Sequence, residues 1–156
     1  MTTELTVPPR KEFQSFHDLP IVTDLDNIEA DVAILGIPFS DPYSMEEVTN
    51  DQTNAPTSIR RFCQRALRGI ERWDFDVGGQ IFDGKDIRVV DVGDIPGDPR
   101  DMGSHYKKAE QVVRKLLAKN VMPIVLGGDH GIPIPVMRAY EGQGPITLVH
   151  IDAHLD

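Results

Sequence analysis

Apolar residues in this chain fall into short, nearly continuous runs, and these runs alternate with stretches of helical periodicity. Runs of this kind are typical of strands that a parallel sheet buries on both faces. They cover residues 31–37, 87–93, 121–126 and 146–151. Helices are predicted from Pro56 to about Arg68, from about Ser104 to Asn120, and over a short segment after His130.

The alternation predicts an α/β fold with three layers, in which helices cover both faces of a parallel sheet. Residues 1–30 are polar and contain prolines, so we expect an N-terminal arm that lies outside the core. Residues 31–156 are expected to belong to one α/β domain. Ligands of open α/β sheets bind beyond the carboxyl ends of the strands, and a functional site is therefore expected where the apolar runs end.

Two of these run ends carry side chains that bind metals. Asp152, His154 and Asp156 follow the last run, and alternate residues of a strand share one face. His130 follows the third run, within the glycine-rich segment 127–131. Carboxylates and imidazoles that converge from two strand ends suit a divalent metal, which can lower the pKa of a bound water. Metal-assisted hydrolysis is therefore the leading hypothesis.

The residues around these motifs allow other interpretations. The glycine-rich segment 127–131 could cradle a phosphate, but it lacks the Lys-Ser/Thr of a P-loop and the GxGxxG spacing. Asp129 is expected to orient His130 or to cap the following turn. His150 has the same strand parity as Asp152, but the sequence favours a buried, hydrogen-bonded histidine there over a metal ligand.

The composition narrows the choice of partners. The formal net charge is −9, which argues against nucleic acid and anionic membranes because both bind cationic surfaces. The charge is compatible with a cationic substrate, although solubility alone explains it. The single cysteine, Cys63, excludes an internal disulfide. Because the chain also lacks a membrane-length apolar run and a signal peptide, we expect a cytoplasmic protein.

The motifs LGGDHG (126–131) and VHIDAHLD (149–156) together resemble the ureohydrolase family, which includes arginases and agmatinases. Weaker similarity covers LGIPF, APTSIR and VVDVGD earlier in the chain. The resemblance implies a parallel α/β sheet that carries two divalent metals, usually manganese and sometimes nickel. It also implies that the metals activate water to attack a guanidinium carbon, which releases urea and an amine.

Roles for single residues follow from the same resemblance. His130 and Asp156 would bind the first metal, His154 would bind the second, and Asp152 would bridge the two. Asp152 and His154 are therefore the expected catalytic residues. The implied substrate is a small cationic guanidino compound such as agmatine, guanidinobutyrate or guanidine. The implied assembly is a homo-oligomer, a trimer or hexamer, with a hetero-oligomer as the alternative.

The chain departs from the family pattern in two ways that bear on function. The family completes its metal site with aspartates from a later strand, and it usually has serine at the position of Gly131. We therefore expect the N-terminal part of a longer enzyme. Two alternatives stay open: a non-catalytic partner subunit or fragment of such an enzyme, and a metal-dependent amide hydrolase, which the DxHxD spacing alone would permit.

Overall fold

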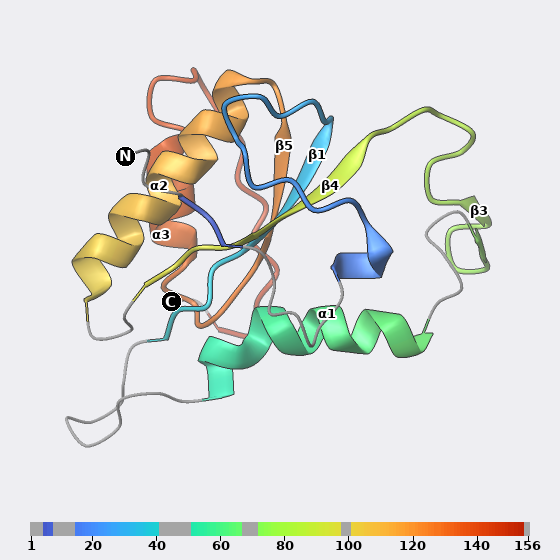
Figure 1. Ribbon diagram of the computed structural model, residues 1–156, viewed down its shortest axis with the longest axis horizontal. Coiled ribbons are helices and arrows are strands. Elements are labelled where there is room, and N and C mark those ends of the chain that lie inside the picture. Colours follow the sequence, from blue (N-terminus) through green and yellow to red (C-terminus); the bar gives the residue numbers. More distant parts are fainter. Residues whose placement is uncertain (1–4, 8–14, 41–50, 67–71, 98–100, 155–156) are drawn as a thin grey trace.

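The computed structural model describes residues 5–7, 15–40, 51–66, 72–97 and 101–154. A three-stranded parallel sheet has the order β4-β1-β5 (Figure 1). The strands are β1 (Val32–Gly36), β4 (Val89–Asp94) and β5 (Met122–Leu126). The helices are α1 (Ala55–Ala66), α2 (Met102–Ala118) and α3 (Pro133–Ala139). Shorter elements are η1 (Phe16–Asp18), η2 (Asp51–Asn54), β2 (Trp73–Asp74) and β3 (Gly79–Gln80).

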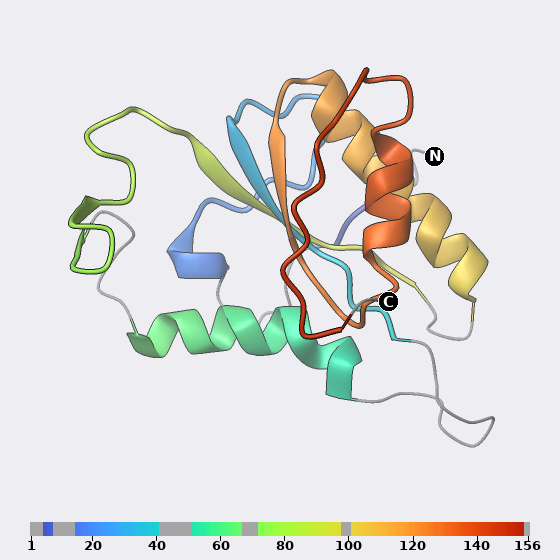
Figure 2. The ribbon, with the colours of Figure 1, turned by 180° about the vertical axis from the view of Figure 1, so that it is seen from behind.

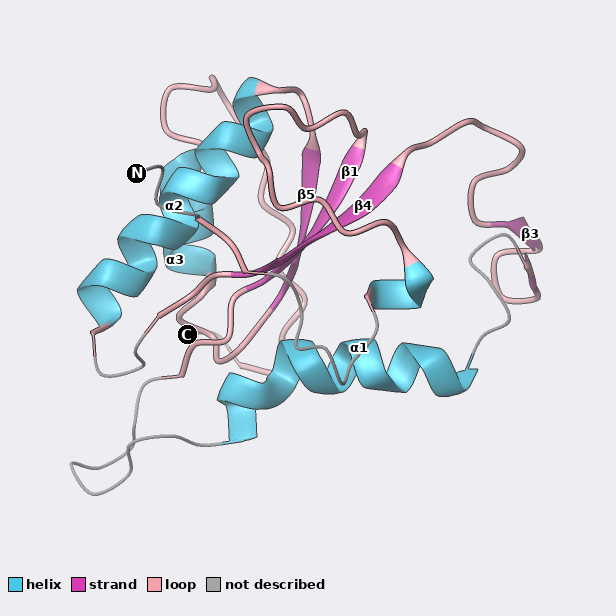
Figure 3. Cartoon of the chain, viewed as in Figure 1, coloured by secondary structure: helices cyan, strands magenta, loops and turns pink. Residues whose placement is uncertain are grey.

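Helices pack on both faces of this sheet, which confirms the predicted α/β class. On one face, Ala33 and Leu35 of β1 share a buried cluster with Val112 of α2, and α3 packs against α2 (Figures 1 and 3). On the other face, Asp91 of β4 contacts Arg60 of α1. No helix in the described ranges combines the length and the apolar character needed to cross a bilayer.

A buried ion-pair network fixes α1 to β4. The side chains of Arg60 and Asp91 are fully buried. Arg60 donates from Nε to Oδ2 of Asp91 at 2.8 Å, from Nη2 to Oδ1 of Asp91 at 2.9 Å, and from Nη1 to Oδ1 of Asp94 at 2.6 Å. The carboxylate of Asp91 also accepts the backbone N–H groups of Phe16 and Gly93, both at 2.9 Å. Asp91 is therefore the point where α1, β4 and the N-terminal segment meet.

The N-terminal arm lies partly inside the core, contrary to our expectation. Leu25, Ile28 and Ala30 belong to the main buried cluster. Val7 exchanges two backbone hydrogen bonds with Asp94, and Ile21 forms a bridge with Asp91. Polarity and prolines misled the prediction, because a few apolar residues are enough to dock an irregular segment. The domain boundary at residue 30 stays a prediction.

The fourth predicted strand is wrong for this structure. Residues 146–151 run as loop (Figure 3), and within the described part of the chain they pair with no strand. Their apolar side chains are exposed rather than buried. A continuous apolar run predicts burial, but a strand forms only where a neighbouring strand accepts its backbone hydrogen bonds. Among the described residues, no strand forms this pairing with residues 146–151.

His105 is a buried polar residue of α2. It is 2% exposed, and neither ring nitrogen has a hydrogen-bond partner among the described residues. Its ring meets that of Phe39 edge-on, with centroids 5.5 Å apart. Burial, and to a lesser degree the Lys108 ammonium group, lowers the pKa of His105, and the Ile95 backbone opposes this only weakly.

We expect His105→Leu to make the free energy of unfolding less dependent on pH. Because the pKa of His105 is lowered in the folded chain, the unfolded chain takes up the proton first as the pH falls. The contribution of neutral His105 is therefore complete above about pH 6.5 and is lost at lower pH. Urea unfolding at about pH 7.5 and about pH 5.5 should show a larger loss of stability in the wild type. Equal losses in both proteins would contradict this role.

Candidate metal centre

The loop after β5 presents His130 at the carboxyl edge of the sheet. The loop is tied to the end of β1: the Asp129 amide donates to the Phe39 carbonyl at 3.0 Å, and the Ile37 amide donates to the Leu126 carbonyl at 2.9 Å. Gly128 has a φ of +35°, and a Cβ there would collide with the carbonyl oxygens of Phe39 and Ile37. The loop therefore requires glycine at this position.

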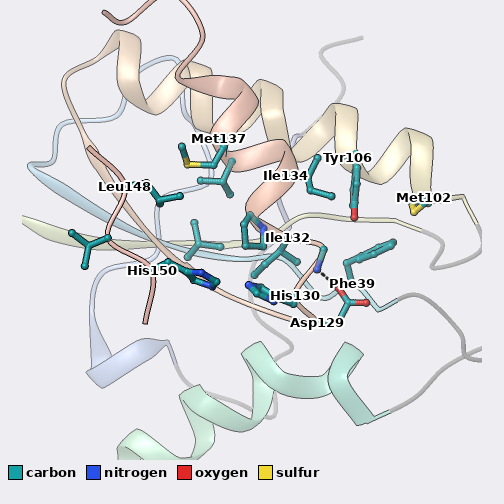
Figure 4. Close-up of a pocket in the computed structure, with 15 residues that line it drawn as sticks. Phe39, Met102, Tyr106, Asp129, His130, Ile132, Ile134, Met137, Leu148 and His150 are labelled. Atoms are coloured by element: carbon teal, nitrogen blue, oxygen red, sulfur yellow. Dashed lines mark hydrogen bonds between the residues drawn. The ribbon is translucent and has the colours of Figure 1, made fainter. Parts of the chain in front are cut away.

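Asp129 caps the turn that follows it. Its carboxylate accepts the backbone N–H of Gly131 at 2.8 Å (Figure 4), so capping is the role that the structure shows among the two expected. A Cβ at Gly131 would lie 2.5 Å from the Tyr106 hydroxyl oxygen and 3.0 Å from the Asp129 carboxylate. A side chain at position 131 would therefore require the Tyr106 hydroxyl to shift.

Three side chains at this edge form a cluster with the spacing of metal ligands. His130, His150 and Asp152 each offer one ligand atom, and these atoms all lie within 4.8 Å of one another. Oδ2 of Asp152 is 3.5 Å from Nδ1 of His130 and 3.4 Å from Nε2 of His150. The two imidazole rings lie next to each other, with centroids 5.3 Å apart (Figure 4).

The predicted ligands His130 and Asp152 are thus brought together, whereas His154 is not part of the cluster. His154 has Nδ1 at 3.7 Å from Oδ1 of Asp152, but its side chain is 82% exposed and points at the opposite oxygen from the cluster. Asp156 lies outside the described residues. The assignment of these four residues as metal ligands therefore stays a prediction.

Sequence reasoning gave His150 the wrong environment. We expected a buried histidine, but its side chain is 45% exposed and takes part in the cluster. The signal was present, because His150 shares its parity with Asp152. It was outweighed by the assumption that residues 146–151 lie within the sheet.

The electrostatics of the cluster keep Asp152 ionised. The backbone N–H of His154 donates to Oδ1 of Asp152 at 2.8 Å. This hydrogen bond is the largest cause that lowers the pKa of Asp152; His130 and His150 act in the same direction, and desolvation opposes them. An ionised carboxylate only accepts hydrogen bonds and so presents its oxygens to a cation.

The donor set fits a divalent transition metal. Two imidazole nitrogens and one carboxylate oxygen suit Mn²⁺, Ni²⁺ or Zn²⁺, and three protein ligands leave coordination positions open for water or substrate. His130 and His150 also line a cavity of about 1080 Å³, whose remaining walls are largely apolar. Figure 4 shows both histidines at its border. The cluster therefore faces a space that a small molecule could enter.

Comparison with known proteins identifies the family to which this chain belongs. The model of the arginase family matches residues 30–156, and the chain belongs to this family. Over 99% of its length it is 29% identical to the mitochondrial agmatinase of Gallus gallus, of which it covers 44%. It is thus a ureohydrolase-family member related to agmatinases.

Solved structures show the same fold. The proclavaminate amidino hydrolase of Streptomyces clavuligerus superposes with a TM-score of 0.70 at 31% identity, and 95% of this chain covers 46% of that chain. A variant of Trypanosoma cruzi formiminoglutamase, solved with two Mn²⁺ ions, gives a TM-score of 0.59 at 26% identity, with 75% and 37% covered. The chain thus spans less than half the length of these relatives.

Proposed function

We propose that the protein is a dinuclear-metal ureohydrolase that cleaves a C–N bond of a guanidino compound and releases urea. The observation that carries the proposal is the cluster of His130, His150 and Asp152 at the carboxyl edge of an arginase-family sheet. The names of its relatives, an agmatinase and an amidino hydrolase, support a guanidino substrate. Agmatine, guanidinobutyrate and guanidine are the compounds that we would test first.

The geometry of Asp152 supports the bridging role proposed for it. Its Oδ2 faces His130 and His150, whereas its Oδ1 faces His154. One carboxylate can therefore offer an oxygen to each of two neighbouring metals, with His130 and His154 as ligands on either side. His150 is the additional donor that the structure suggests.

Bound metals would supply Lewis acidity and an activated water at neutral pH. The chain's own residues would hold and orient the site. Asp152 would offset the repulsion between two cations, and the cap of Asp129 on Gly131 would keep the His130 loop in place. We propose Mn²⁺ as the preferred metal, with Ni²⁺ as the alternative; the formiminoglutamase solved with Mn²⁺ supports this choice.

The test combines metal content with urea release. The protein would be purified with Mn²⁺ or Ni²⁺, analysed for metal per chain, and assayed on guanidino compounds, with simple amides as the matched controls. We expect metal-dependent urea from at least one guanidino compound and no hydrolysis of the amides. Full metal loading without urea from any of them would contradict the proposal, and amide hydrolysis would favour the amide hydrolase alternative.

A second candidate is a partner subunit that is inactive alone. The observation that favours it is the openness of the site, because the side chains of His130 and His150 are almost half exposed and the cluster has three described donors. This candidate predicts little bound metal and no urea until a second chain is added.

A further inference from the structure

The neighbours of Gly131, and not its backbone, leave no room for a side chain at this position. Gly131 is not among the described glycines with a positive φ, so its backbone conformation does not require glycine. A Cβ there would, however, lie 2.5 Å from the Tyr106 hydroxyl oxygen and 3.0 Å from Oδ1 of Asp129. The first distance is far shorter than van der Waals contact allows. Tyr106 and Gly131 are therefore a complementary large and small pair.

The core holds the ring of Tyr106 in place. Tyr106 belongs to α2, and it packs against the main buried cluster. Its ring meets that of Phe39 edge-on, with centroids 5.1 Å apart, and Phe39 is 1% exposed. Figure 4 shows the hydroxyl pointing from α2 toward the loop of Asp129 and His130. A shift of the hydroxyl therefore requires that the ring move against the core.

The loop beside Tyr106 carries His130, and Figure 2 shows from behind how it lies between the sheet and α3. The Gly131 amide donates to Oδ1 of Asp129 at 2.8 Å, so His130 lies between the two residues that this bond joins. The Phe39 carbonyl accepts the Asp129 amide at 3.0 Å. Phe39 thus fixes the residue before His130, and Tyr106 limits the position of the residue after it.

We propose that Tyr106 is a positioning residue of the metal centre and that it acts through Gly131. Its hydroxyl fills the space that a side chain at position 131 would need, and this contact sets where the loop presents the imidazole of His130. Protein interiors are close-packed, so a change in either member of the pair displaces the loop. The inference rests on the proposed function in one respect, namely that His130 binds a metal.

The test is a double-mutant cycle on the 156-residue chain, with Gly131→Ala, Tyr106→Phe and the two combined. The first readout needs no metal: it is the hydrogen-exchange protection of the residue-131 amide, which donates to Asp129. We expect Gly131→Ala alone to lower this protection at least about fivefold, because the Cβ and the hydroxyl cannot share one place. In the double variant the hydroxyl is gone, and protection should return to within about twofold of that in Tyr106→Phe.

The second readout is the Mn²⁺ affinity, measured by calorimetric titration. Gly131→Ala should weaken binding about tenfold, as loss of a residue that supports a metal ligand typically does. The added Tyr106→Phe should recover most of this loss. Such a recovery separates positioning from a general loss of stability, because two substitutions that merely destabilised the fold would not compensate each other. Thermal unfolding of each variant would show that the fold is retained.

Two variants outside the pair serve as matched controls. Gly103→Ala adds a methyl group on α2, where the nearest described contact of the new Cβ is Oδ1 of Asp101 at 4.0 Å. Tyr140→Phe removes a hydroxyl from a second tyrosine that packs against the main buried cluster. Neither should change the exchange of the residue-131 amide or the Mn²⁺ affinity.

The metal-free cycle decides the role of Tyr106. Equal effects of Gly131→Ala with and without the Tyr106 hydroxyl would overturn the proposal, as would a Gly131→Ala variant with wild-type exchange. If the wild-type chain bound no Mn²⁺, the proposed function would fail, and the exchange cycle would still confirm or overturn the coupling of Tyr106 to the His130 loop.

Discussion

Arg60→Ala is expected to destabilise the fold by about 3–5 kcal/mol, because it leaves buried carboxylates without their cation. Asp91 is fully buried, and Arg60 contacts both of its oxygens as well as Asp94. A loss of this size approaches the whole stability of many domains. Urea unfolding followed by circular dichroism would measure it, and a variant too unstable to show a folded baseline would agree with the expectation.

Arg88→Ala is the matched control for this experiment. Arg88 also carries two ion pairs, with Glu29 at 3.7 Å and Asp31 at 3.6 Å, but its side chain is 54% exposed. Exposed pairs contribute about 0–1 kcal/mol, so this variant should unfold close to the wild type. If Arg60→Ala and Arg88→Ala lowered the free energy of unfolding by similar amounts, burial would not be the reason for the large contribution expected of Arg60.

Asp152→Asn is expected to weaken Mn²⁺ binding by more than about a hundredfold. Substitution of residues that merely support metal ligands typically costs about 10–100-fold in affinity, and Asp152 contacts both histidines of the cluster directly. Removing its charge should cost more than that. Calorimetric titration with Mn²⁺ would measure the change, with thermal unfolding to show that the fold is retained.

The control for the metal titration is Asp76→Asn, which removes one negative charge from the β2–β3 turn, where Asp76 is exposed. It should leave the Mn²⁺ affinity nearly unchanged. If Asp152→Asn bound Mn²⁺ as well as this control, Asp152 could not be a bridging ligand.

Local pattern was enough to predict the parts of the fold that depend on neighbours in the chain. The glycine-rich segment 127–131 was placed at the end of the third apolar run, and the structure shows a loop there in which Gly128 cannot be replaced. A short helix was predicted after His130, and the structure has α3 there; it begins at Pro133, where the missing N–H costs no hydrogen bond. Local pattern could not predict the order of the strands in the sheet. The two strands that pair with β1 come from segments far along the chain.

The features that were missed depend on such distant contacts. The sequence placed Arg60 in a helix, but nothing local indicates a buried arginine, since arginines are mostly exposed unless paired. Its partner Asp91 lies 31 residues away. His150 was missed for a related reason. Two-residue parity places side chains reliably only while a sheet holds the backbone, and residues 146–151 pair with no described strand.

The carboxylate of Asp91 also bears on how the limits of this protein should be defined. The match of the arginase-family model begins at residue 30. The amide of Phe16, however, donates to Asp91, and Leu25 and Ile28 complete the buried cluster. A polypeptide that began at residue 30 would lose one donor to a buried charge and part of its core. A boundary drawn where the family model begins would therefore divide a cooperative unit, and the alignment with the Gallus gallus agmatinase, which covers 99% of the chain, does include these residues.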